Sequence, residues 1–120
     1  QRVGSRLTKS GILLGTPDYM APEQITGAPV GGREDIYSLG VVMFEALTGS
    51  KPFPGETAVQ ILFQHLEAVC PRVSALLPVD PDLDDLVASL MAREPEDRPD
   101  SPAALAGRLA ALRQHVEAGN

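Results

Sequence analysis

Several polar residues with possible functional roles stand in one short string, GTPDYMAPEQ at residues 15–24. Thr16 stands between a glycine and a proline, a setting typical of a bend. Its hydroxyl can donate and accept hydrogen bonds at once, which suits it to positioning a second hydroxyl group. The alternative is an ordinary Gly-Thr-Pro turn. Two further charged residues follow at defined gaps: Asp35 stands twelve residues after Glu23, and Arg98 sixty-three residues after Asp35.

The first element that must position these residues is the stretch 35–49, DIYSLGVVMFEALTG. On a 3.6-residue period its apolar side chains cover nearly the whole circumference, which is typical of a buried helix. Gly40 costs about 1 kcal/mol against alanine there, so we expect a close approach to the backbone. Gly49 supplies a helix stop. A strand is the alternative, because Val41 and Val42 are β-branched, but length and Gly49 favour the helix.

Three more long helices are expected after this one, and a short helix at residues 22–25 before it. A helix at 57–67 carries an apolar stripe formed by Ala58, Val59, Leu62, Phe63 and Leu66. We expect this stripe to pack on the core, with a surface for docking other proteins as the alternative for Phe63 and Leu66. His65 is expected on the polar side of the same helix.

The remaining two helices have clear start signals. Asp82 is the expected N-cap of the first, whose apolar residues repeat at helical spacing up to Met91. Ser101 followed by Pro102 starts the last helix, because proline is favoured at the first helical position. The apolar face of that last helix consists of Leu105, Leu109, Leu112 and Val116.

Composition narrows the class of protein. The chain has 120 residues, 43% of them hydrophobic, and a net charge of −6, divided into +3 over residues 1–17 and −9 over 18–120. The acidic body argues against nucleic-acid binding, and no apolar run is long enough to span a membrane. Two separated histidines and one cysteine offer no metal cluster. Cys70 is expected to be a small buried hydrophobe in a cytoplasmic protein, although an intact parent could carry a membrane anchor elsewhere.

Taken together, GTPDYMAPEQ, the D-x-x-S-L-G segment from Asp35 and Arg98 in the string EPEDRP form a specific combination. The chain resembles the C-terminal part of the large lobe of a bacterial eukaryotic-like serine/threonine protein kinase. This resemblance covers essentially all residues. It implies a mainly α fold, a partial kinase C-lobe with an activation segment and four main helices, without the N-lobe and catalytic loop. Residues 1–23 would be the activation segment ending in Ala-Pro-Glu, and 24–118 a helical subdomain.

The resemblance also implies roles for individual residues in the activation segment. Thr8 and Ser10 fall where such kinases are phosphorylated, although Ser and Thr are also common in loops. Gly15, Thr16, Pro17 and Tyr19 belong to the substrate-positioning loop. In an intact kinase Thr16 supports the catalytic aspartate and a nearby lysine.

The remaining roles that the resemblance implies are structural. Glu23 and Arg98 would form a buried bidentate ion pair, a geometry that suits arginine. Asp35 would anchor the catalytic loop, with an ordinary helix N-terminal carboxylate as the alternative. None of these residues performs phosphoryl transfer, and none is a metal ligand.

The nucleotide-binding signatures of kinases are the Gly-rich loop, the strand lysine, HRD and DFG. The sequence contains none of them. An intact parent kinase would use ATP and Mg²⁺, but we expect this chain alone to bind neither and to be inactive. The start at Gln1 rather than Met is expected of a fragment.

The first function hypothesis is therefore a fragment of a kinase that transfers the ATP γ-phosphate to protein Ser or Thr. The alternative is a non-catalytic protein-interaction module, either a degenerate or a truncated kinase. An unrelated helical bundle would require all the motif matches to be accidental. Expected partners are a protein substrate, the remainder of the kinase domain, and a second copy through exposed apolar surface.

Overall fold

The computed structural model describes the backbone of residues 17–118 and the side chains of residues 17–114. Thr8, Ser10, Gly15 and Thr16 therefore lie outside the described residues. Within the described range the chain is helical and contains no strand, which confirms the predicted mainly α class. The helices are α1 (Pro22–Thr26), α2 (Arg33–Thr48), α3 (Ala58–Glu67), α4 (Pro81–Leu90) and α5 (Pro102–Ala118), with 3₁₀ turns η2 (Pro17–Tyr19), η3 (Val73–Ala75) and η4 (Pro95–Asp97).

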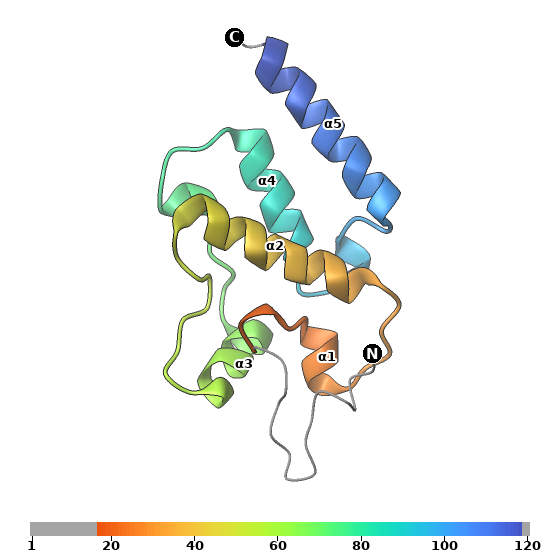
Figure 1. The fold of residues 1–120 in the computed structure, drawn as a ribbon. Helices are drawn as coiled ribbons and strands as arrows, with labels where there is room; N and C mark the ends of the chain where they lie inside the picture. The colour runs from red at the N-terminus through yellow and green to blue at the C-terminus, as the bar shows by residue number, and fades with distance from the viewer. Residues whose placement is uncertain (1–16, 119–120) are drawn as a thin grey trace.

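Helix α2 crosses the middle of the molecule, and the other helices are arranged on its two sides (Figure 1). On one side lie α1 and α3, which contact each other and the η2 turn. On the other side α4 packs across α2, and α5 follows α4 and extends away from the body. The helix predicted as the centre of the chain is thus the element that the two halves share.

The ends of α2 are set by glycine at both sides. Gly32 precedes the helix with φ +106°, and its N–H donates to Glu34 Oε1 at 2.8 Å. Acidic residues in the first turn also suit the helix dipole. Gly49 ends the helix in the left-handed region with φ +76°, and its N–H donates to Glu45 O at 2.8 Å. The predicted helix stop at Gly49 is confirmed.

The later helices each begin at a side-chain cap. Thr57 Oγ1 accepts from the N–H of Gln60 at 3.2 Å to begin α3. The cap of α4 is Asp80, not Asp82 as predicted: Asp80 Oδ1 accepts from the N–H of Asp82 at 2.8 Å. Proline occupies the first position of α4, so the cap must stand one residue earlier than Pro81. Ser101 Oγ accepts from Ala104 N–H at 3.1 Å and starts α5 as predicted.

Two groups of buried side chains form the core, and α2 contributes to both. The larger group contains Ala21, Tyr37, Val41, Phe44, Phe53, Val73, Val87 and Met91. The smaller group contains Ile36, Leu86, Leu90 and Leu105. Between them, a Cβ added to Gly40 would stand 2.7 Å from Leu90 Cβ and 2.8 Å from Met91 Cγ. The close approach predicted at Gly40 is therefore real, and the partner is α4.

Helix α2 is not buried on all sides, because Leu39, Val42 and Leu47 are exposed. On α5, Leu105 is buried and Leu109 exposed, while the side chain of Val116 lies outside the described residues. Among the described helices, none is both long and apolar enough to cross a membrane.

The predicted facing of α3 is wrong. Ile61 and His65 face the core, and Val59 and Phe63 point to solvent, with Phe63 63% exposed.

Candidate functional site

Among the described residues, a buried bidentate ion pair joins Glu23 on α1 to Arg98 after η4. Arg98 Nη1 donates to Glu23 Oε2 at 2.6 Å, and Nη2 donates to Oε1 at 2.9 Å. The Arg98 side chain is 0% exposed and that of Glu23 is 6% exposed. The two residues lie 75 positions apart, so this bidentate pair ties the start of the helical body to its end.

Every N–H of the Arg98 guanidinium has an acceptor. Besides the two bonds to Glu23, Nε donates to Ala92 O at 2.7 Å, Nη1 to Arg33 O at 3.0 Å and Nη2 to Arg93 O at 3.0 Å. The guanidinium carbon also lies 4.9 Å from the centre of the Tyr37 ring, a cation–π distance. Arginine supplies five donors in a rigid plane, which lysine cannot replace.

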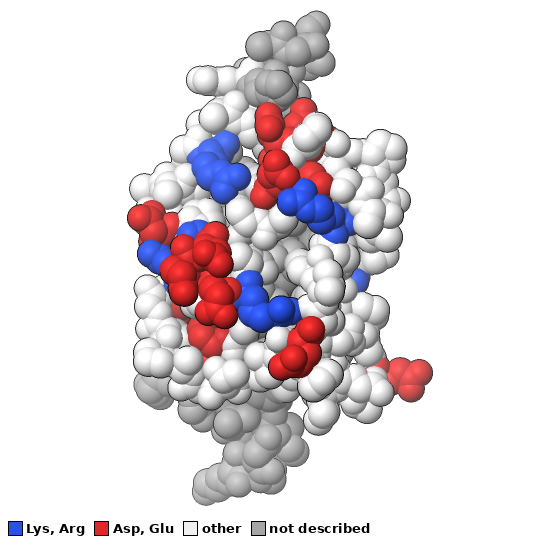
Figure 2. Space-filling view, turned by 180° about the vertical axis from the view of Figure 1, so that it is seen from behind, with Lys and Arg blue, Asp and Glu red and all other residues white. Residues whose placement is uncertain are grey.

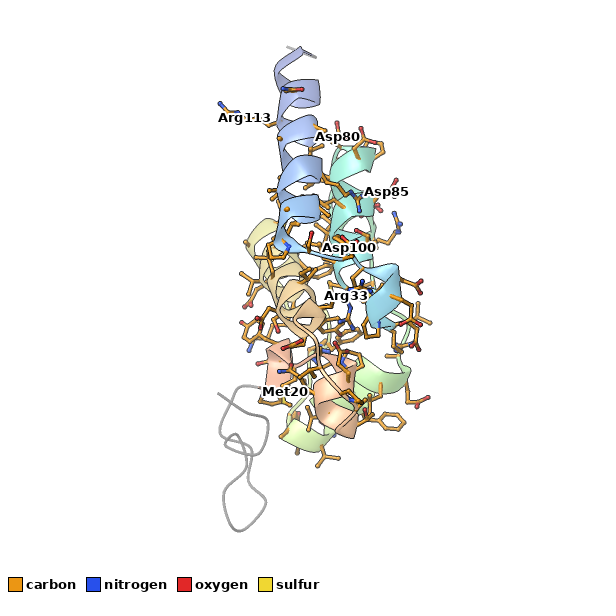
Figure 3. The ribbon with its side chains drawn as sticks, turned by 90° about the vertical axis from the view of Figure 1, so that its right-hand side faces the viewer. Met20, Arg33, Asp80, Asp85, Asp100 and Arg113 are labelled. Carbon is orange, nitrogen blue, oxygen red and sulfur yellow. The ribbon has the colours of Figure 1, made fainter. Side chains whose placement is uncertain are left out.

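Arg33 completes this junction from the other side. It is the first residue of α2, and its Nη1 donates to Pro95 O at 3.2 Å (Figure 3). The carbonyl group of the same residue accepts from Arg98. The start of α2 is therefore attached to residues 95–98 by two hydrogen bonds. Arg33 donates one of them to Pro95 and accepts the other from Arg98.

The pKa of Glu23 reflects these contacts. Burial is the largest single effect and raises the pKa, but the hydrogen bonds from Arg98 and the main chain, with the charge of Arg98, outweigh it. The pKa is therefore lowered, so the carboxylate is ionised at neutral pH.

The η2 turn, which opens the described part of the predicted substrate-positioning loop, is held by three side chains from other parts of the chain. Asp18 is buried, and its Oδ2 accepts from Lys51 Nζ at 2.8 Å. The Tyr19 hydroxyl donates to Glu45 Oε1 at 2.5 Å, and this bond raises the pKa of the phenol. Ser38 Oγ donates to the carbonyl of Tyr19. The turn is thus bonded to α2 and to the linker that follows it.

Beside this turn the structure assembles an aromatic centre that sequence reasoning missed. His65 Nδ1 and the Tyr37 hydroxyl are 2.6 Å apart, and the Phe53 ring meets the imidazole edge-on at 4.8 Å. His65 was expected on the polar face of its helix but is only 1% exposed. The Arg93 guanidinium donates to the carbonyls of His65 and Ala68 and fixes the end of α3. The sequence offered one sign of this burial. Ile61 and His65 are four residues apart, so on a helix His65 shares a face with an apolar residue.

The other predicted residues are distributed around this site. Pro17 is half-buried in the η2 turn, and Cys70 is half-buried against the larger core group. Asp35 is exposed and lines a groove between the starts of α2 and α5, together with Leu39 and Leu105. The alternative that Asp35 is a first-turn carboxylate agrees with its position in α2. Its role toward a catalytic loop stays a prediction.

Exposed ion pairs contrast with the buried one. Arg72 Nη1 lies 2.8 Å from Asp85 Oδ1, and the two side chains are 49% and 62% exposed. On the face shown in Figure 2, acidic side chains gather in groups, and basic side chains lie beside them. Such pairs are screened by water and contribute little to stability.

Comparison with known proteins decides the family. The sequence model of the protein kinase domain matches residues 4–109. The chain belongs to the protein kinase family. The Glu23–Arg98 pair therefore connects the Ala-Pro-Glu string at residues 21–23 to the last turn before α5.

Similar proteins with known names are bacterial serine/threonine-protein kinases. PknL of Mycobacterium tuberculosis is 40% identical over 111 residues, 92% of this chain and 28% of the relative. The DNA damage-responsive kinase RqkA of Deinococcus radiodurans is 42% identical over 111 residues, 92% of this chain and 17% of the relative. Pkn1 of Myxococcus xanthus is 42% identical, over 91% of this chain and 16% of the relative. The chain spans less than a third of the length of these relatives.

Kinases of this family use ATP with Mg²⁺. Among the described residues no group of three or more His, Cys, Asp or Glu side chains could hold a metal ion.

Proposed function

We propose that this chain forms the C-terminal part of the large lobe of a kinase that transfers the ATP γ-phosphate to Ser or Thr of proteins. Its part is to supply the activation segment, the substrate-positioning loop and the helical scaffold. In phosphoryl transfer the protein acts almost entirely by positioning and electrostatic stabilisation. A scaffold that holds the acceptor loop rigidly is therefore a direct contribution to the reaction.

The observation that carries the proposal is the bidentate Glu23–Arg98 pair beneath the η2 turn. Through it the end of the activation segment is attached to the start of α2 and to the segment after α4 by bonds to a single guanidinium. The turn itself is bonded to α2 through Tyr19 and Ser38. These contacts support a loop held in place for a substrate whose acceptor hydroxyl Thr16 would help to position.

A chimera tests this proposal. The matching segment of the Mycobacterium tuberculosis relative is replaced by residues of this chain, and transfer of labelled γ-phosphate to a protein substrate is measured with ATP and Mg²⁺. We expect the chimera to be active, Thr16→Ser to retain activity and Thr16→Val to lose it, because valine has the shape of threonine without the hydroxyl. A chimera that folds cooperatively but transfers no phosphate contradicts the proposal.

The second candidate is a non-catalytic interaction module, favoured by one specific observation. The exposed apolar side chains Val42 on α2 and Phe63 on α3 offer surface for a protein partner. Calorimetric titration of the 120-residue chain with ATP and Mg²⁺ is expected to show no binding under either function. Clear binding would mean that the chain builds a nucleotide site that its sequence does not reveal.

A further inference from the structure

We propose that His65 is a positioning residue: as a neutral imidazole it accepts from Tyr37 at Nδ1 and uses its Nε2–H to hold the η2 turn against α3. The inference rests on the proposed function, since the turn affects a substrate only in a kinase. It assigns a task to a residue that lies on the inner side of α3 and contacts Tyr37, the ring on which Arg98 stacks.

The first observation is the geometry of the ring. His65 is buried, its Nδ1 lies 2.6 Å from the Tyr37 hydroxyl, and the Phe53 ring packs edge-on at 4.8 Å. Tyr37 and Phe53 are themselves buried. The imidazole therefore has one orientation available to it, because a rotated ring would lose both contacts.

The second observation is the arrangement of protons. Burial raises the pKa of Tyr37, so its hydroxyl keeps its proton, and burial lowers the pKa of His65, so the imidazole is neutral. If the hydroxyl donates to Nδ1, the hydrogen of the imidazole must be on Nε2. This tautomer also places an N–H, rather than a lone pair, toward the main-chain groups of Pro17 and Asp18, which favour a protonated ring.

The third observation is that two buried polar atoms, one on α3 and one on the η2 turn, have no hydrogen-bond partner. Nε2 of His65 makes no hydrogen bond of good geometry, and the same holds for Oδ1 of Asp18 on the adjacent η2 turn. Buried polar atoms are nearly always paired, so each exception needs an explanation. Asp18 and Pro17 of the η2 turn act on the imidazole through their charge and main-chain groups, so the ring faces this turn across the boundary with α3.

The groups around the imidazole agree with a neutral ring. Asp18 faces it from η2 and favours the charged form, and Arg93 from the segment after α4 opposes it. Tyr37 faces it from α2, and Cys70 and Arg72 line a cavity with it from the segment after α3. Lys51 neutralises part of the Asp18 charge. Burial therefore decides the protonation state, and the ring is held as a hydrogen-bonding group rather than as a cation.

Helix α3 links this contact to the surface. His65 and Ile61 occupy its inner face, and Val59 and Phe63 its exposed face. Arg93 holds the end of the helix through the carbonyls of His65 and Ala68. A displacement of α3 therefore moves the imidazole beneath the η2 turn.

The first test uses the 120-residue chain itself. Long-range ¹H–¹⁵N spectra of the imidazoles are recorded, with His115 as the second signal and His65→Gln as the assignment variant. We expect His65 to be the Nε2–H tautomer. An Nδ1–H tautomer, or a ring that is charged at neutral pH, overturns the inference.

Two variants separate the two ends of the ring. His65→Gln places an amide N–H near the position of Nε2, and His65→Asn places an acceptor near that of Nδ1. We expect backbone amide exchange of Asp18 and Tyr19 to stay close to that of the unaltered chain in His65→Gln and to rise about tenfold in His65→Asn, the factor that one ordinary hydrogen bond supplies. Equal exchange rates in the two variants overturn the inference. Tyr37→Phe, which removes only the hydroxyl, is the control for loss of packing.

The third test measures phosphate transfer by the chimera of this chain and the Mycobacterium tuberculosis relative. His65→Asn should raise KM for the protein substrate about tenfold with kcat nearly unchanged, and His65→Gln should restore KM. An active chimera in which both variants behave alike contradicts the positioning role. A chimera that is inactive with His65 in place contradicts the proposed function, while the tautomer and exchange measurements still decide on His65.

Discussion

Replacing Glu23 by glutamine should lower the free energy of unfolding by about 3–5 kcal/mol, the cost of leaving one charge of a buried pair without its partner. The shape of the side chain hardly changes. What is lost is the negative charge facing a guanidinium that is fully buried. The three remaining acceptors of Arg98 are neutral carbonyl groups, and none of them compensates a full charge.

The assay is urea unfolding followed by far-UV circular dichroism on the 120-residue chain, with sucrose added if the unaltered chain unfolds too readily. A loss of this size is a large fraction of the stability of any small domain. Asp85→Asn is the matched control, because it removes one carboxylate from an ion pair of similar length, 2.8 Å, that is exposed. We expect that control to change stability far less.

A double replacement by methionine at Glu23 and Arg98 separates the cost of an unpaired charge from the worth of the pair. Apolar side chains of similar volume avoid the desolvation penalty, so the double variant should be more stable than Glu23→Gln alone. The reasoning is refuted if Glu23→Gln costs no more than Asp85→Asn.

The pH dependence gives an independent check on the same pair. Since the folded-state pKa of Glu23 is lowered, its stabilisation is present above the unfolded pKa of about 4.3. It is lost as pH falls from there through the folded-state pKa. Glu23→Gln should remove this part of the acid unfolding curve.

Three further predictions concern packing, surface and protonation. Gly40→Ala should destabilise by about 1–3 kcal/mol in urea unfolding, because its Cβ would stand 2.7 Å from a side-chain carbon of α4. Gly107→Ala has nothing within 4 Å and should instead stabilise by up to about 1 kcal/mol; the same sign for both would contradict the packing argument. Val42→Ser should reduce self-association in sedimentation velocity, because Val42 is a 49% exposed apolar residue on α2; an unchanged sedimentation profile would count against α2 as the contact surface. Unfolding free energy should fall as pH drops below about 6.5, the pKa of an unfolded imidazole, because burial lowers the pKa of His65 in the folded chain; a His65→Gln variant that keeps the same slope would exclude His65 as its source.

Much of the helical architecture is readable from local pattern. The apolar run around Gly40, the stop at Gly49 and the Ser101-Pro102 start each depend on residues within one or two helical turns. The motif spacing further led to Glu23 and Arg98, which the structure brings into a bidentate contact across 75 positions. That contact was accessible from sequence only because the family resemblance supplied it.

The positions of the helices can be predicted from the sequence, because caps and hydrophobic periodicity depend on residues that lie close together along the chain. Only the tertiary structure decided which face of each helix is buried. On α3 two faces compete, and the apolar one carrying Phe63 is exposed while the one carrying His65 is buried. The physical reason is that burying a polar imidazole is costly unless it finds a hydrogen-bond partner. That partner is Tyr37, which is 28 residues away on another helix.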